Sequence, residues 1–504
     1  MVQPRLAERK VVSKVMDRLD NSTLQQNRAY NIGFSVNEGT GNEEYFDMLK
    51  FLISEFSLNN DTDVSNLKYE EIFVSGNTGN QALQTSKIIS VVLSEVQATK
   101  LRSLTFPYIS IVEPDIKVQV YWGETPSNDD DKLIVAHNTP SSDRKEDFLN
   151  IFTNLWDSNR QSSKSVSSDS ENEDLDVSIV ANDTPVSTLG FSSSPDNWAH
   201  ERLPPWNLCR ISKEKFDNPL EYIPYGGTYS YPITEPSKVL VFVIDSGVNK
   251  THSELQDRVI YEESLVATEP ETEDFFGHGT FVSSIITGKM AGVAKNVQLG
   301  SIKVIDRDGL ADVKTIISAF NRVVQLKNST FKDYSILVNL SINADGVSNT
   351  LLSAIASANE QGILTVISAG NNSDDACSYS PSGEPSSITV GAIGFPNDAF
   401  FSYSNYGKCV DILAPGQSVL GASDETISVL SFQSGTSMAA PMVTGVCAQV
   451  WQNNPSLSPA EVRKRVLDSA LRGLITDLDE NTPNLLLWNG YSGPTLLPEM
   501  ITDS

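Results

Sequence analysis

Residues 239–247 read VLVFVIDSG, six consecutive apolar residues followed by Asp245, Ser246 and Gly247. A run of this length, closed by turn-forming residues, predicts a strand that is buried on both faces, as strands of parallel sheets are. Downstream of it, apolar strands alternate with segments of helical periodicity. We expect further strands at 297–304, 335–341, 363–369 and 388–392, and helices near 278–288, 312–327 and 349–361. This alternation predicts an α/β domain of three layers, in which helices cover both faces of a parallel sheet.

Two shorter segments add reactive side chains to the aspartate. His278 lies in GHGT at 277–280, and Ser437 lies in SGTSMAAP at 434–441. Asp, His and Ser together supply an orienting carboxylate, a general base and a hydroxyl nucleophile, which cleave acyl bonds. Taken alone, DSG also fits any buried parallel strand that ends in a turn, and GHGT is short, whereas the serine segment is long enough to be specific. The order Asp, His, Ser along the chain separates this arrangement from other serine hydrolases that use the same three groups.

These motifs, Asp245 in VIDSG, His278 in GHGT and Ser437 in GTSMAAP, resemble those of the subtilisin-like serine proteases, in the branch of proteinase K and cerevisin. The resemblance runs from about Pro204 to about Ser469. It implies a serine endopeptidase in which Ser437 attacks the scissile carbonyl, His278 transfers the proton and Asp245 orients the imidazole. It also implies a monomer that cleaves proteins or peptides broadly, after apolar residues. Two other functions fit the same fold: a binding protein with a blocked cleft, and an esterase-like hydrolase of small acyl substrates.

The oxygen of a tetrahedral intermediate needs a hydrogen-bond donor. The strand expected at 363–369 continues into Gly370 and Asn371 and resembles the family segment whose asparagine amide fills that role. With the backbone N–H of Ser437, Asn371 would then form the oxyanion hole; the alternative is an asparagine that serves only in the turn of 371–375. The resemblance places substrate binding on three short segments: Gly309 and Leu310; Ser341, Ile342 and Asn343; Ala369 and Gly370.

Two of these segments depart from the family pattern. Where relatives read Ser-Leu-Gly-Gly, residues 341–344 read SINA, so that Asn343 and Ala344 replace both glycines. Residues 308–312, DGLAD, likewise lack the family's second glycine. Side chains at these positions are expected to narrow the approach of a peptide strand, which leaves specificity and turnover open.

Cys377 and Cys409 match positions that form a disulfide in aqualysin-like relatives. The bond would close the loop after the oxyanion segment and would imply an oxidising compartment, and the alternative is two reduced thiols. The implied chemistry requires no cofactor. Asp411, with the carbonyls of Pro385 and Ser387, matches a calcium site of proteinase K. Hard cations prefer such oxygen ligands, and the alternative is a plain surface aspartate.

The sequence divides into five parts: a polar, disordered N-terminus at 1–27, a small α+β domain at 28–121, an acidic Ser-rich linker at 122–200, a peptidase domain at 201–491 and a tail at 492–504. The second part resembles a subtilisin propeptide, which implies a ferredoxin-like domain that acts as folding chaperone and intramolecular inhibitor. A generic ferredoxin-like interaction domain is the alternative. A long solvated linker is open to cleavage, so we expect maturation between Tyr121 and Trp206.

The formal net charge of −27 disfavours nucleic acid and anionic membranes as partners, because both need basic surface. No uninterrupted apolar stretch is long enough to span a bilayer. The resemblance implies a product of the secretory pathway, delivered to a vacuole or lysosome-like compartment or exported. The first residues nevertheless lack the apolar core of a secretory signal. Either the protein does not use that route or the chain lacks its original start, and the sequence leaves both open.

Overall fold

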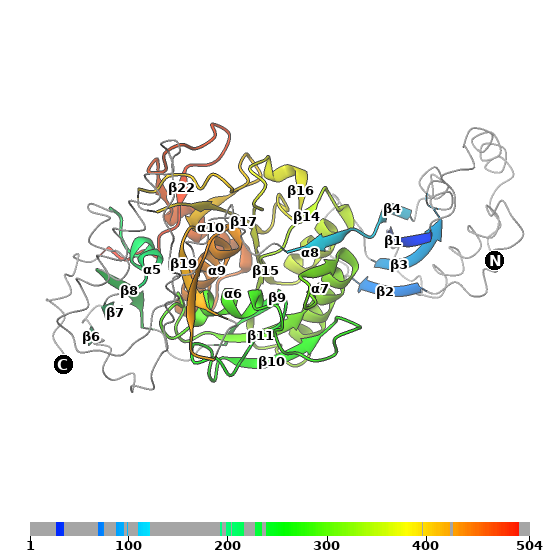
Figure 1. Ribbon diagram of the computed structural model, residues 1–504, viewed down its shortest axis with the longest axis horizontal. Helices are drawn as coiled ribbons and strands as arrows, with labels where there is room; N and C mark the ends of the chain where they lie inside the picture. The colour runs from blue at the N-terminus through cyan, green and yellow to red at the C-terminus, as the bar shows by residue number, and fades with distance from the viewer. Residues whose placement is uncertain are drawn as a thin grey trace, which may run out of the picture.

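The computed structural model describes residues 27–34, 69–74, 87–94, 98, 109–120, 192–193, 198–202, 204–215, 227–233, 238–395, 397–423 and 427–492. Within these ranges a nine-stranded sheet dominates, with the order β10-β11-β9-β13-β15-β17-β18-β22-β21 (Figure 1). Neighbouring strands run parallel, except for the antiparallel pair β21–β22. The predicted three-layer α/β architecture is confirmed.

The five predicted strands are present as β9 (Val239–Asp245), β11 (Gln298–Lys303), β13 (Ser335–Leu340), β15 (Ile363–Ser368) and β17 (Ile388–Ile393). The sheet also contains strands that the sequence did not predict: β10 (Val259–Ser264), β18 (Ile412–Pro415), β21 (Leu471–Arg472) and β22 (Leu485–Leu486). These four lie toward the two edges of the sheet, where half-polar or very short strands carry little apolar pattern.

Helices cover both faces of the sheet (Figure 1). Alternate residues of β9 contribute to two different hydrophobic clusters, which explains its continuous apolar run. Val239, Val241 and Val243 belong to a cluster with α6 (His278–Thr287), α9 (Thr436–Asn453) and α10 (Pro459–Ser469). Leu240, Phe242 and Ile244 belong to a cluster with α7 (Val313–Asn328) and α8 (Asn349–Glu360).

Shorter elements complete this unit. They are α5 (Trp206–Ile211), β12 (Leu310–Asp312), β14 (Ala344–Asp345), η7 (Ala376–Ser378), β16 (Tyr379–Ser380), β19 (Val419–Ala422) and β20 (Leu430–Gln433). None of the helices in the described ranges combines the length and apolar character that a membrane crossing requires.

The N-terminal part forms a separate four-stranded antiparallel sheet with the order β2-β3-β1-β4 (Figure 1). Its strands are β1 (Asn27–Phe34), β2 (Tyr69–Val74), β3 (Lys87–Ser94) and β4 (Ile109–Pro114). The apolar pattern of residues 108–118 predicts one long strand, but the structure divides it, because β5 (Lys117–Gln119) leaves this sheet and pairs with β12. In this part the spacing of apolar residues also predicts helices at 46–56 and 94–104, which lie outside the described residues, apart from Ala98.

The end of the predicted linker belongs to the large domain. β6 (Ser192–Ser193) and β7 (Trp198–Arg202) form an antiparallel sheet with β8 (Thr228–Pro232). Glu201, on β7, is buried and forms an ion pair of 2.8 Å with Lys295. The linker predicted to reach residue 200 therefore ends before β6, and its other residues, 122–191 and 194–197, lie outside the described ranges.

Candidate active site

Asp245 and His278 meet at the carboxyl edge of the sheet. Asp245 is the last residue of β9, and His278 is the first residue of α6. The imidazole Nδ1 lies 2.8 Å from Oδ1 and 3.0 Å from Oδ2 of the carboxylate. Both side chains are about 1% exposed. The carboxylate therefore fixes the ring orientation, and the contact at Nδ1 leaves Nε2 as the nitrogen that can accept a proton.

Burial and neighbouring charge act in opposite directions on the imidazole. Burial alone lowers the pKa of His278, but the carboxylate of Asp245 and, more weakly, that of Asp274 raise it, and the pKa lies above the ordinary value of 6.5. The protonated ring is thus stabilised where it stands, as a general base requires after it has taken a proton.

Asp274 ties the strand end to the helix start. Its carboxylate accepts hydrogen bonds from Ser246 Oγ (2.8 Å), from the backbone N–H groups of Phe276 (3.2 Å) and Gly277 (2.7 Å), and from both N–H (2.8 Å) and Oγ1 (2.6 Å) of Thr280. Because Ser246 follows Asp245 and the other three residues surround His278, Asp274 fixes the two elements relative to each other. No motif in the sequence marks this residue.

Ser437 lies in the first turn of α9, beside the end of β13. Its Oγ donates to the carbonyl of Ser341 at 3.2 Å, and Ser341 Oγ donates to the carbonyl of Ser437 at 3.0 Å. A buried polar chain continues from there: Asn339 Nδ2 donates to Ser341 Oγ at 3.0 Å, and Thr444 Oγ1 of α9 donates to Asn339 Oδ1 at 2.8 Å. These contacts fix the start of α9 against the sheet.

Asn371 contacts the same turn from the segment that follows β15. Its Oδ1 accepts hydrogen bonds from Thr436 N (2.8 Å) and Thr436 Oγ1 (3.0 Å), which fixes the orientation of the amide. Gly435 has φ of +147°, and a Cβ built there would lie 3.1 Å from Asn371 Nδ2. Glycine at position 435 therefore lets the backbone before α9 lie close to Asn371 Nδ2. This nitrogen thus lies beside the turn that carries Ser437.

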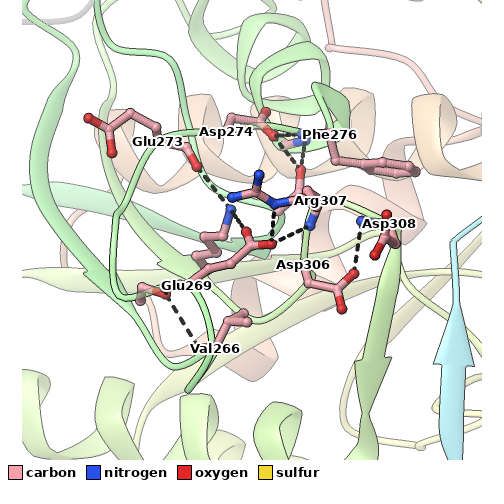
Figure 2. A network of polar contacts seen from close by, with 12 residues as sticks. Val266, Glu269, Glu273, Asp274, Phe276, Asp306, Arg307 and Asp308 are labelled. Atoms are coloured by element: carbon pink, nitrogen blue, oxygen red, sulfur yellow. Dashed lines mark hydrogen bonds and ion pairs between the residues drawn. The ribbon is translucent and has the colours of Figure 1, made fainter.

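A polar network joins the loop before His278 to the loop before β12 (Figure 2). Glu269 Oε1 accepts from Arg307 N (3.1 Å) and Nε (2.8 Å), and Glu269 Oε2 lies 3.1 Å from the fully buried Lys303 Nζ. Lys303 Nζ also donates to the carbonyl of Glu273 at 2.9 Å. Burial raises the pKa of Glu269, but the bonds from Arg307 and Lys303 outweigh it and hold that pKa at about 2. The carboxylate is therefore charged, and it holds the two loops together.

A strand from the N-terminal part lies along the segments predicted to bind substrate. β5 pairs antiparallel with β12, Val120 N donates to Gly309 O at 2.8 Å, and β5 also packs against β14. At Gly309 φ is +76°, and an added Cβ would lie 2.8 Å from the ring of Phe276 and 3.1 Å from Val120 O. The inserted strand thus runs toward the loop that leads to His278.

Two carboxylates preceding β5 cap helices of the large domain. Glu113 accepts from Ser348 Oγ (2.6 Å), Asn349 N (3.0 Å) and Thr350 N (2.8 Å) at the start of α8. Asp115 Oδ1 accepts from Lys314 N at 2.8 Å at the start of α7. Carboxylates satisfy the unpaired N–H groups at helix N-termini, so these contacts are favourable ones.

The geometry agrees with a comparison against known families. The model of the subtilase family, peptidase S8, matches residues 236–490. The chain belongs to the subtilase family. The matched region holds the large sheet from β9 onward together with Asp245, His278, Asn371 and Ser437.

Curated relatives of this subtilase include three fungal proteins. It is 36% identical over 306 residues to the subtilase-type proteinase psp3 of Schizosaccharomyces pombe, which covers 59% of the chain and 66% of that relative. It is 31% identical over 335 residues to alkaline protease 2 of Aspergillus fumigatus, a match that covers 62% of the chain and 65% of that relative. It is 33% identical over 309 residues to subtilisin-like protease 3 of Saccharomyces cerevisiae, a match that covers 57% of the chain and 61% of that relative. The chain thus matches less than two thirds of the length of each.

Among solved structures, this subtilase is similar to a cold-adapted subtilisin-like serine proteinase. The TM-score is 0.51 at 32% sequence identity, and the match covers 57% of this chain and 98% of the other. The fold predicted from the resemblance is thus the fold of a solved relative.

The disulfide implied by the resemblance is present. Cys377, in η7, is bonded to Cys409, and their Cα atoms are 5.3 Å apart. Cys209 and Cys447 are buried free thiols, and burial raises the pKa of each to about 12. They are therefore core residues rather than reactive groups.

The residues expected to bind calcium do not fit a metal ion. Arg463 Nη2 donates to Asp411 Oδ1 at 2.7 Å, and Arg463 Nε donates to the carbonyl of Ser387 at 2.7 Å. Thr389 N donates to the second carboxylate oxygen of Asp411 at 2.9 Å. The guanidinium of Arg463 thus contacts Asp411 and Ser387, two of the three expected ligands, the third being Pro385. It supplies the positive charge that a calcium ion would have supplied. Within the described ranges, no group of three or more His, Cys, Asp or Glu side chains is arranged to hold a metal.

The predicted site residues make two separate sets of contacts, one around Asp245 and His278 and the other around Ser437 and Asn371. Asp245 contacts His278, Ser437 contacts Ser341, and Asn371 contacts the turn before Ser437. The remaining predicted substrate-binding residues lie at or just before the start of β12 (Gly309 and Leu310) or on the segments that follow β13 and β15 (Ile342, Asn343, Ala369 and Gly370). Asp274, Asn339 and Thr444 were not predicted, because no sequence motif marks their polar side chains.

Proposed function

We propose that this subtilase is a serine endopeptidase that uses Asp245, His278 and Ser437. The buried contact between Asp245 and His278 Nδ1, at 2.8 Å, is the observation that carries the proposal. A carboxylate and an imidazole shielded from water at a strand end cost solvation energy, and a catalytic site is the usual reason to retain such a pair. The family match supports the same reaction.

In the proposed reaction, Ser437 Oγ leaves its hydrogen bond to the Ser341 carbonyl and attacks the scissile carbonyl of the peptide. His278 Nε2 takes the hydroxyl proton, and Asp245 stabilises the imidazolium that results. The same nitrogen then returns the proton to the leaving amine, and the acyl group stays on Ser437. Water, deprotonated by His278, hydrolyses that ester and regenerates the enzyme.

The oxyanion of both tetrahedral intermediates would bind between the Asn371 amide nitrogen and the backbone N–H of Ser437. The second donor lies in the first turn of α9, where backbone N–H groups have no partner within the helix and the dipole favours negative charge. The fixed orientation of the Asn371 amide means that little reorganisation is needed when the charge develops.

Replacing Asn371 with alanine is therefore expected to lower kcat about 100- to 1,000-fold, equivalent to about 3 to 4 kcal/mol of transition-state stabilisation, with little change in KM. Steady-state hydrolysis of a peptide substrate measures both constants. Asn328→Ala, on the exposed end of α7, is the matched control and should keep the wild-type rate. If Asn371→Ala changed only KM, Asn371 would be a binding residue and not the oxyanion donor.

Residues 28–121 are proposed to be an inhibitory prosegment. β5 completes a sheet with β12, where a peptide substrate would add its own strand, and the capping contacts of Glu113 and Asp115 anchor it. A covalently attached strand has a high effective concentration, so it should exclude substrates until it is cut. The Cys377–Cys409 disulfide supports a product of the secretory pathway, where such bonds persist.

Labelling with a fluorophosphonate tests both proposals. The full-length chain should be labelled slowly, and a form cleaved between residues 121 and 191 and freed of the prosegment should be labelled at Ser437. Absence of labelling after prosegment removal would favour a binding protein with a blocked cleft. Labelled protein that hydrolyses short esters but not casein would favour the esterase-like alternative.

A further inference from the structure

Two backbone segments flank the proposed nucleophile. β13 and β15 pair in parallel up to Leu340 and Ile367, and the segments that follow them continue past the carboxyl edge of the sheet. Residues 341–344 contact Ser437 through the carbonyl of Ser341 (3.2 Å). Residues 368–371 contact the preceding residue, Thr436, through Gly370 N (3.1 Å) and Asn371 Oδ1 (2.8 Å). A substrate residue whose carbonyl reaches both Ser437 and Asn371 must therefore lie across these two segments.

The side chain of Asn343 joins the two segments. Its Nδ2 donates to the carbonyl of Ser368 (3.0 Å) and to Ser382 Oγ (2.9 Å), and its Oδ1 accepts from Ser368 Oγ (2.8 Å). Ser382 Oγ in turn donates to the carbonyls of Ser368 (3.2 Å) and Ala369 (3.1 Å). Ser368 is 1% exposed and Ser382 is 4% exposed, so both partners of the amide are fixed in the interior.

A glycine at position 343 would leave the space between these segments without a side chain. The amide of Asn343 instead occupies it and is held by three direct hydrogen bonds. A large substrate side chain entering there would have to displace the amide, which would leave the buried polar groups of Ser368 and Ser382 without this partner. Such displacement is costly because unsatisfied buried polar groups lose their solvation without compensation.

We propose that Asn343 limits the size of the side chain on the residue that precedes the scissile bond, so that cleavage follows glycine, alanine or serine. This inference rests on the proposed endopeptidase function and makes Asn343 a specificity-determining residue of it. It narrows the expectation, drawn from the family resemblance, of cleavage after apolar residues to cleavage after small ones.

The test compares two peptide substrates that differ only in the residue before the cut, which is alanine in one and phenylalanine in the other. The enzyme is the form of the protein, produced from the full chain, that fluorophosphonate labels. The wild type should show kcat/KM at least about tenfold higher for alanine, within the range of 10- to 200-fold by which apolar pockets discriminate. Asn343→Gly should reduce or invert that ratio, mainly by raising kcat/KM for phenylalanine. Asn328→Gly makes the same chemical change at the exposed end of α7, outside the proposed site, and should keep the wild-type ratio.

Three results would overturn the inference. A wild type that cleaves after phenylalanine as well as after alanine overturns it while leaving the endopeptidase function in place. An unchanged ratio in Asn343→Gly does the same, and if that variant does not fold, Asn343→Ala provides the ratio instead. A chain in which no form is labelled at Ser437 overturns the endopeptidase function and, with it, the specificity that depends on it.

Discussion

Replacing Ser437 with alanine is expected to lower kcat for peptide hydrolysis by about a millionfold, the loss typical when a nucleophile of this kind is removed. The fold should persist, because Thr436 still bonds to Asn371 and the apolar residues of α9 are unchanged. Activity on a chromogenic peptide, with circular dichroism of the same sample, separates loss of catalysis from loss of structure.

Ser329→Ala, at the exposed end of α7, is the control for this substitution and should keep full activity. In cells that lack related proteases, the Ser437→Ala chain should stay full length if the maturation cut is intramolecular. A Ser437→Ala protein that hydrolyses peptides at the wild-type rate would remove Ser437 from the mechanism. Normal maturation of that variant would instead show that another protease makes the cut.

Replacing Asp245 with asparagine is expected to lower kcat by about 10,000-fold, since an asparagine beside Nδ1 holds the imidazole in the wrong tautomer. The pH profile should change as well. The neutral imidazole is the active form, so activity falls as pH drops through the pKa of His278, which Asp245 raises above 6.5. Without that carboxylate, the pKa falls and the acid limb of kcat/KM should move to lower pH.

Asp257→Asn is the matched control, because Asp257 is exposed and its positive φ of 63° suits asparagine equally well. It should keep both the rate and the acid limb of the wild type. An Asp245→Asn profile with the wild-type acid limb would mean that His278 is not the group that titrates, and the base would then have to be sought elsewhere.

The sequence predicted those parts of the fold that depend on local pattern. The central strands carry continuous apolar runs because both faces are buried, and β9 is the extreme case with all seven residues buried. Asp245 was predictable as a candidate because it ends such a run, and Ser437 because it lies in a long, specific segment at 434–441. Each of these signals lies within a few consecutive residues.

What could not be predicted depends on contacts between distant segments. Asp274 is unremarkable in sequence, and its role arises only where the loop after β9 meets α6. Arg463 likewise reaches Asp411 across 52 residues of sequence, so the expected calcium ligands gave no sign of a neighbouring cation. The departure at Asn343 was visible, but its consequence required the positions of Ser368 and Ser382.

The position of β7 limits where the N-terminal part of the protein can be removed by proteolysis. Lys295 is 8% exposed and donates to the carbonyls of Lys289 and Met290, and Glu201 of β7 provides its counter-charge. Removing Glu201 would leave the ammonium group of Lys295 buried without its counter-charge, which would lower the free energy of unfolding by about 3 to 5 kcal/mol. An active form is thus expected to begin upstream of β7 and to retain Glu201. N-terminal sequencing of the active species would reveal this, and a start after Arg202 would contradict it.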